Sequence, residues 1–169
     1  MKLDFNKFDS RAQAETGTPM QILDQWTGEP MMDGDKPCRV ILRGSASKTM
    51  QAAMRDRQRA AMAAHKKGKG DDEARVMEDI HNQLCEASVP FVVGFENVSN
   101  GDVPATAEDA AWFFDLTFPE MGVKEDEDGN PITGKDGKPE FEMKNSPFAK
   151  QVGEYVGKQA NHMGNVKSG

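Results

Sequence analysis

Three residues in the middle of the chain have types and spacing that could bind a metal ion. Glu78 and His81 are three positions apart, and Cys85 follows one helical turn later, so a helix would bring them close together. A Glu-x-x-His pair is typical of di-metal carboxylate bundles, but such sites need matching ligands from other helices. The sequence contains no second Glu-x-x-His. We therefore predict a surface histidine at position 81 and no metal ligands.

Two glycine-containing stretches resemble ligand-binding loops only in part. The segment from Gly129 to Lys135 approaches a phosphate-binding loop, but Asp136 stands where that loop needs Ser or Thr to bind magnesium. If Gly129 is aligned with the invariant glycine of a calcium-binding loop, Lys124 and Lys135 occupy ligand positions and would repel the ion. Between Val89 and Leu116 no nucleophile has a base beside it, and no Ser/His/Asp order or pair of catalytic carboxylates stands out in the chain. We therefore predict no catalytic, cofactor-binding or metal-binding residues, and we interpret the chain as a non-enzyme.

The charge of the chain is distributed unevenly. Its 169 residues fit a single domain, and the net charge is −7. Residues 45–70 carry seven basic and one acidic side chains, whereas residues 71–143 carry four basic and nineteen acidic ones. An acidic chain is a poor general binder of nucleic acid. We expect the basic segment to form ion pairs with a neighbouring acidic helix.

Composition also indicates where the protein acts. The start of the chain has no signal peptide, no apolar run reaches the ~20 residues of a membrane span, and the two cysteines form no Cys-x-x-Cys motif. We expect a soluble protein of a reducing cytoplasm that contacts no membrane. Met is frequent, at 11 residues. Met residues either fill gaps in the core or form an adaptable binding surface.

The first third of the chain predicts a short helix and a small antiparallel sheet. Asp9 or Ser10 can cap a helix that ends at Gly17. Short apolar runs separated by Gly, Pro and Asp turns then predict two or three strands, around residues 20–23, 31–32 and 38–43. Ser45 or Ser47 can cap the basic, alanine-rich helix that follows, which Gly68 and Gly70 end.

The acidic helix that begins near residue 71 has one apolar stripe. Its members recur at three- and four-residue steps: Val76, Ile80, Leu84, Ala87 and Phe91. We expect Pro90 to kink this helix and the residues up to Phe95 to complete it. A turn at Asn100-Gly101 then leads into a helix capped by Thr106, which would bring Trp112 and Phe113 close to Phe91 and Phe95.

An acidic segment and a closing helix complete the predicted fold. Residues 123–144 repeat an Asp-Gly-x-Pro turn, which fits a hairpin or a flexible insertion. Asn145 or Ser146 can cap the last helix, with Pro147 in its first turn, and residues 164–169 should be frayed. We thus predict an α+β fold: a small N-terminal antiparallel sheet of two or three strands followed by four or five helices.

In the order of its motifs, the chain resembles the tail assembly chaperones of long-tailed bacteriophages. The opening Phe5-Asn-Lys-Phe-Asp-Ser-Arg-Ala and the strand that ends in Leu42-Arg-Gly-Ser are similar to the start of that family. Val93-Gly-Phe-Glu-Asn97 resembles the family's V-G-W-E-N signature, with Phe95 in place of Trp. The helix start at Ser146-Pro-Phe148, with Gln151-Val152, resembles the family's closing helix. The likeness covers residues 5–156, except for the insertion from Lys124 to Lys144.

This resemblance implies a role in virion morphogenesis without catalysis. Members are implied to bind the long, aggregation-prone tape measure protein in the host cytoplasm and to recruit major tail protein around it. They are expected to be absent from the mature virion, and many are also made as a frameshifted longer form. An adaptable apolar surface kept soluble by charge suits that role. Our candidate protein-binding residues are the Met and aromatic residues of the predicted helices: Met50, Met54, Phe91, Phe95, Trp112 and Phe113.

Two other functions stay open at this point. A structural minor tail or neck protein would have similar size and composition, and it would be found in the virion. A small regulatory module could instead grip nucleic acid with the basic helix 47–69, in which case its binding would weaken with salt.

Overall fold

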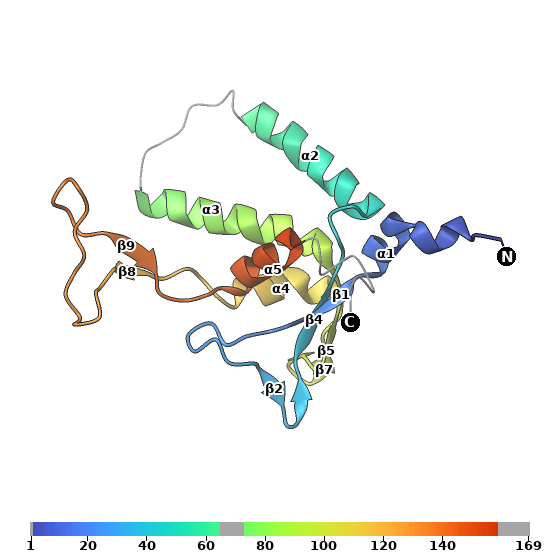
Figure 1. Cartoon of the computed structure of the whole chain (residues 1–169), viewed down its shortest axis with the longest axis horizontal. Coiled ribbons are helices and arrows are strands. Elements are labelled where there is room, and N and C mark those ends of the chain that lie inside the picture. Colours follow the sequence, from blue (N-terminus) through green and yellow to red (C-terminus); the bar gives the residue numbers. More distant parts are fainter. Residues whose placement is uncertain (1, 65–72, 159–169) are drawn as a thin grey trace.

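The computed structural model describes residues 2–64 and 73–158, and its fold class is α+β as predicted (Figure 1). A three-stranded antiparallel sheet lies at the centre, with strand order β1-β4-β5. Its strands are β1 (Thr18–Gln21), β4 (Arg39–Leu42) and β5 (Val92–Glu96). The predicted N-terminal strands therefore form only part of this sheet, because its third strand comes from the middle of the chain.

The N-terminal helix forms where capping residues predict it. A 3-10 turn, η1 (Phe5–Phe8), precedes α1 (Ser10–Thr16). The Asp9 carboxylate accepts hydrogen bonds from the backbone N–H groups of Arg11 and Ala12, at 3.1 and 3.0 Å. Gly17 ends the helix with a positive φ of 85°. Both boundaries confirm the prediction.

Short hairpins extend from the sheet. Between β1 and β4 the chain forms β2 (Met32–Asp33) and β3 (Lys36–Pro37), joined at the predicted Gly34 turn. After β5 it forms β6 (Ser99–Asn100) and β7 (Val103–Pro104), joined at Gly101. The acidic insertion is a hairpin rather than a disordered loop, with β8 (Met121–Val123) paired to β9 (Phe141–Met143).

The middle of the chain contributes two long helices. They are α2 (Lys48–Ala64) and α3 (Glu73–Ser88), and Figure 1 shows them diverging from each other above the rest of the fold. Ser47 caps α2 as predicted, since its Oγ accepts the N–H of Met50 at 3.0 Å. The prediction that Pro90 kinks a helix that continues to Phe95 is wrong. The helix instead passes into a 3-10 turn, η2 (Val89–Phe91), and Val92 begins strand β5.

Two helices close the core beneath α3. A 3-10 turn, η3 (Ala107–Asp109), leads into α4 (Ala110–Asp115), and α5 (Phe148–Gly157) comes last. The Asp109 carboxylate accepts the Thr106 N–H at 2.8 Å, so the turn begins at Thr106 as predicted. The predicted caps of the last helix are wrong. Thr117 lies just after α4, and its Oγ1 accepts the Phe148 N–H at 2.8 Å.

The core combines apolar side chains from the sheet with aromatic residues from the short helices. Phe113 lies at its centre, with its ring 5.1 Å from that of Phe95 and stacked 4.6 Å from that of Phe148. The predicted proximity of Phe113 to Phe95 is therefore confirmed. The other buried members come from every large element: Met20, Ile22, Val40, Leu42, Met50, Cys85, Phe91, Val92, Ala110, Phe114, Ala149 and Val152.

Candidate protein-binding surface

The apolar stripe of α3 lies mostly outside the core, which corrects the prediction that it is buried. Ile80 is 54% exposed and Leu84 is 36% exposed, while Phe91 beyond the helix is buried. Among the side chains of α3 that the structure describes, residues 77–88, the buried ones are instead His81, Cys85 and Ser88. The helix is thus rotated so that its small polar side chains face the core. An apolar edge remains uncovered beside the acidic side chains.

Helix α2 projects from the fold over most of its length. Met50 is buried at its base and Ala53 is half-buried, but every side chain from Met54 to Ala63 is exposed. Met54 is 45% exposed and Met62 is 69% exposed. A helix in water gains most of its stability from packing rather than from propensity. Because most of α2 lacks such packing among the described residues, α2 is a candidate binding surface for another molecule.

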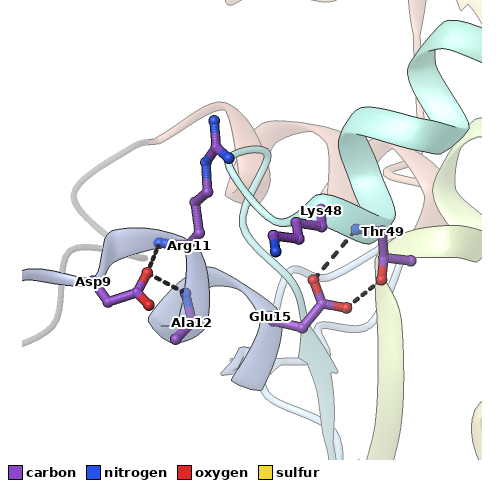
Figure 2. Close-up of a pocket in the computed structure, with 6 residues that line it drawn as sticks. All are labelled: Asp9, Arg11, Ala12, Glu15, Lys48 and Thr49. Atoms are coloured by element: carbon purple, nitrogen blue, oxygen red, sulfur yellow. Dashed lines mark hydrogen bonds between the residues drawn. The ribbon is translucent and has the colours of Figure 1, made fainter. Parts of the chain in front are cut away.

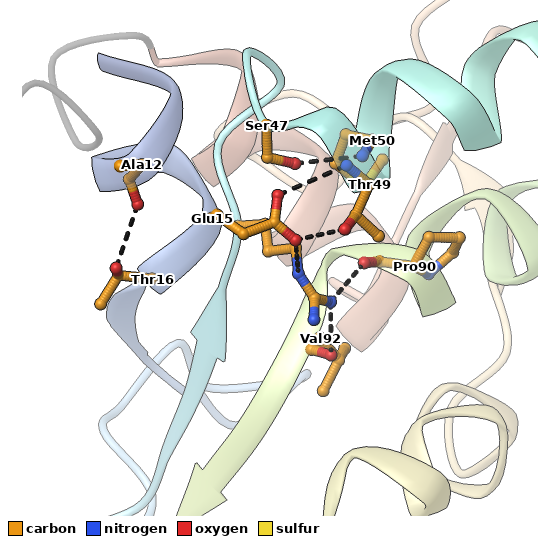
Figure 3. Close-up of polar contacts among 9 residues, drawn as sticks. Ala12, Glu15, Thr16, Ser47, Thr49, Met50, Pro90 and Val92 are labelled. Carbon is orange, nitrogen blue, oxygen red and sulfur yellow. Dashed lines mark hydrogen bonds and ion pairs between the residues drawn. The ribbon is translucent and has the colours of Figure 1, made fainter. Parts of the chain in front are cut away.

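The base of α2 is held by a polar network centred on Arg43 and Glu15. Figure 3 shows Glu15 and Thr49 in this network, beside Pro90 and Val92. Arg43 donates from Nε to the Glu15 carboxylate at 3.2 Å and from Nη1 to the carbonyl oxygens of Pro90 and Val92, at 2.9 and 3.2 Å. Thr49 donates to the same carboxylate with its hydroxyl and its N–H. These bonds and the charge of Arg43 lower the pKa of Glu15. The network joins α1, β4, β5 and the first turn of α2.

Beside this network lies an open pocket of about 620 Å³ between α1 and α2. Figure 2 shows its lining residues, with Asp9 bonded to its own helix and Glu15 bonded to Thr49. Arg11 and Lys48 stand exposed at its rim. Both carboxylates are engaged in structural contacts. The pocket is therefore a consequence of how α2 is anchored.

The six predicted binding residues fall into three groups. Met50, Phe91 and Phe113 are buried in the core. Phe95 and Trp112 are partly buried against that core. Met54 alone among the six is largely exposed. The spacing of these residues in the sequence could not distinguish core residues from surface residues, because Met and aromatic residues are frequent both in cores and at interfaces.

A second apolar surface lies beside α4, between that helix and the segments around Met31 and Val98. A pocket of about 320 Å³ is lined mainly by apolar side chains, among them Met31, Trp112 and Leu116. Cys38 lies in its wall and donates from Sγ to the carbonyl oxygen of Asn97 at 3.1 Å. Burial, with a contribution from Asp33, raises the pKa of the Cys38 thiol. The pocket can accept an apolar side chain from a partner.

The predicted surface histidine is buried, which is a further correction. His81 is 4% exposed, and its Nε2 lies 3.3 Å from the sulfur of Cys85. Burial lowers the pKa of His81 and raises the pKa of Cys85, and Asp115 adds to the rise at the thiol. Both groups are therefore neutral near pH 7. A neutral thiol is a weak nucleophile and a weak metal ligand.

Some predictions concern residues that the structure does not describe. His65, His162 and the predicted frayed tail 164–169 lie outside the described ranges, as do the glycines expected to end the basic helix. Among residues 2–64 and 73–158, no group of three His, Cys, Asp or Glu side chains could hold a metal ion. Within the same ranges, no helix is long and apolar enough to cross a membrane.

The residues that sequence reasoning missed are those whose partners lie far along the chain. Arg43 and Gln151 are the main examples, since each contacts backbone groups of distant segments. Met62 was also missed, because it stands off the stripe that Met50 and Met54 define. Comparison of the chain with protein-family models, with curated proteins and with solved structures found no match.

Proposed function

We propose that this chain is a non-enzymatic tail assembly chaperone of a long-tailed bacteriophage, whose client is the tape measure protein. In this proposal it keeps that protein soluble in the host cytoplasm and helps recruit major tail protein around it. It would be absent from the mature virion. A frameshifted longer form of itself would be a further partner. The proposal rests on the sequence resemblance and on one structural observation.

That observation is the pair of uncovered helices. Helices α2 and α3 expose Met54, Met62, Ile80 and Leu84, while other side chains of each helix are buried in the core. Exposed apolar residues at helical spacing are what an amphipathic client helix recognises. Methionine adapts to different partner surfaces, which suits a client with many similar helical segments. The charged residues on the same helices, mostly basic on α2 and mostly acidic on α3, keep these surfaces in solution.

The test is co-expression with the tape measure protein of the same phage. We expect most of that protein to be soluble with the wild-type chain and most of it to be insoluble without it. The variants M54Q/M62Q and I80Q/L84Q should lose this effect, because they remove apolar contact without touching the core. If the tape measure protein is equally soluble without the chain, the proposed function is wrong.

A matched control tests whether the effect belongs to these two helices. Met121 and Phe141 are also exposed, but they lie on the acidic hairpin. The variant M121Q/F141Q removes comparable exposed apolar area and should leave client solubility unchanged. Circular dichroism of each variant verifies that the fold is intact. If the hairpin variant also leaves the tape measure protein insoluble, client binding is not specific to α2 and α3.

The structural alternative is distinguished by the composition of the virion. A minor tail or neck protein is part of the finished particle, whereas an assembly chaperone leaves it. Mass spectrometry of purified virions should therefore detect major tail protein and no peptides of this chain. Detection at a stoichiometry similar to other tail components would favour the structural role.

One observation favours the nucleic-acid alternative. Arg55, Arg57 and Arg59 on α2 are exposed, and no ion pair involves them among the described residues. Free cations on one helix can bind phosphates in a salt-dependent way. An electrophoretic mobility shift at low salt with the wild-type chain and with R55E/R59E tests this function. We expect no shift with either protein, because the acidic body repels nucleic acid.

A further inference from the structure

The two long helices carry opposite charge. Helix α2 contains four basic residues and one acidic residue, whereas α3 contains four acidic residues and one basic residue. They are similar in length, at 17 and 16 residues. The expected ion pairing between these neighbouring helices is absent from the described residues, since none of the ion pairs there joins α2 to α3. Each helix therefore offers a charged face that the other could complement.

The charged side chains border the exposed apolar ones on both helices. On α2, Arg55, Arg59 and Met62 follow one another at steps of four and three residues and so share one side of the helix. On α3, Asp79 and Glu86 are seven residues apart and lie on the opposite side of the Ile80–Leu84 edge from buried His81. The α2 face therefore combines Met62 with two basic side chains, and the α3 face combines Ile80 and Leu84 with two acidic ones.

The fold keeps these faces apart within one molecule. The Arg43 network fixes the base of α2 to β4 and β5, and the buried side of α3 packs on α4 and α5. Figure 1 shows α2 diverging from α3, which lies along α5 and α4. Helix α2 consequently has no packing partner beyond its first turns among the described residues. A partner with an acidic and apolar helix face would cover it, and this chain carries such a face on α3.

We propose that the chain forms a symmetric dimer in which α2 of each copy packs on α3 of the other. A two-fold axis makes the contact reciprocal, so that both basic faces and both acidic faces are covered at once. The inference uses the same helices as the proposed function. The dimer would keep the client-binding faces covered until a client helix displaces the second copy.

The test uses charge-reversal variants of the full chain, alone and mixed in pairs. Their association is measured by sedimentation equilibrium without client. The wild-type chain should be dimeric, and its dissociation constant should rise with ionic strength. The variants R55E/R59E and D79K/E86K should each dissociate at least about tenfold more readily, because each places like charges at both contacts. A one-to-one mixture of the two variants should recover the dimer, since every contact in the mixed pair is again between opposite charges.

Control variants separate the contact from the effect of net charge. K135E/K138E and E125K/E127K change the net charge by the same amounts as the two test variants, but they lie on the acidic hairpin. They should sediment like the wild-type chain. The fourfold variant R55E/R59E/D79K/E86K should dimerise with itself and not with the wild-type chain. Circular dichroism of each variant verifies that the helices form.

Two results would overturn the proposal. The first is a wild-type chain that stays monomeric at all concentrations, in which case the faces serve only the client or another partner. The second is a dimer whose dissociation constant is the same in the test and control variants, since that dimer uses another surface. Neither result depends on co-expression with the tape measure protein. Failure of the dimer and failure of the chaperone role are therefore distinguishable.

Methionine methyl signals give an independent readout. Dilution of the wild-type chain should shift the NMR signals of Met54 and Met62, because they leave an interface. Met32 and Met121 are similarly exposed but lie on the hairpins, so their signals should not move. Shifts confined to Met32 or Met121 would contradict the assigned contact.

Discussion

The Nε2 atom of His81 lies 3.3 Å from the sulfur of Cys85, and both side chains are buried on the core side of α3. The His81 ring also packs edge-on against Phe118, with centroids 4.8 Å apart. This pair replaces the apolar contacts that the sequence pattern predicts for the helix. It therefore makes the packing of α3 sensitive to protonation.

Protonation of His81 should destabilise the fold. Burial lowers the pKa of His81 from its ordinary value of 6.5, so the unfolded chain binds the proton more readily than the folded chain. The free energy of unfolding should be highest above that value and should fall as the pH drops below about 6.5. Urea unfolding of the wild-type chain and of H81Q, between about pH 7.5 and pH 5.5, measures the slope. The slope should be smaller in H81Q, and equal slopes would contradict the assignment.

Replacement of Arg43 should weaken the junction of α1, α2 and the sheet. Its guanidinium donates to two backbone carbonyl oxygens and to Glu15, and R43M leaves these acceptors without that donor. We expect a loss of about 2 kcal/mol or more in unfolding free energy, measured by urea denaturation. The control is R39M, because the Arg39–Glu96 pair is 41% exposed on both sides and should contribute less than about 1 kcal/mol. Equal losses in the two variants would show that the backbone contacts of Arg43 add nothing.

Gln151 should be as important as an apolar core residue. Its Oε1 accepts the Leu23 N–H at 3.0 Å, and its Nε2 donates to the carbonyl oxygens of Leu23 and Ser146, each at 2.9 Å. The variant Q151L should cost about 2–3 kcal/mol, because it leaves backbone groups without partners in a buried place. Hydrogen exchange at the Leu23 amide should accelerate. E154L, at an exposed position of the same helix, should change stability by less than about 0.5 kcal/mol.

Gly17 should not tolerate a side chain. Its φ is +85°, and a Cβ there would lie 2.9 Å from the carbonyl oxygen of Leu42 and 3.1 Å from Cγ2 of Val93. G17A should therefore cost about 3 kcal/mol or more in thermal or urea unfolding, from backbone strain and overlap together. Gly28 has a similar positive φ of +73° with nothing within 4 Å. G28A should lower the unfolding free energy by only about 1–2 kcal/mol. A similar decrease in both variants would show that close packing at Gly17 does not contribute.

The sequence predicted the local elements well, because their signals are local. Asp9, Ser47 and Thr106 cap or begin helices where predicted, and the Asp-Gly turns sit in hairpins. The continuation of α3 into a strand was not predicted. Phe91 to Phe95 fit either a helix or a strand as a short apolar run, and pairing with distant β4 decides the outcome.

The candidate surface was predicted only in part, for a related reason. An apolar stripe indicates which side of a helix is apolar, but it does not indicate whether the fold supplies a partner. For α3 the core takes His81 and Cys85 instead, and Ile80 stays exposed. Only the first turn of α2 packs against the core, so Met50 is buried while Met54 is exposed. Tertiary packing overrides the one-dimensional pattern in both helices.

The pairing of β4 with β5 has a consequence for how the protein is made. Leu42 pairs with Val92, so the sheet joins segments that are 50 positions apart in the sequence. Contacts at such separation form slowly, because the intervening chain must first be closed into a loop. The ribosome therefore releases α2 and α3 before the strand that anchors them exists. Both helices are therefore synthesised before the central sheet can be completed.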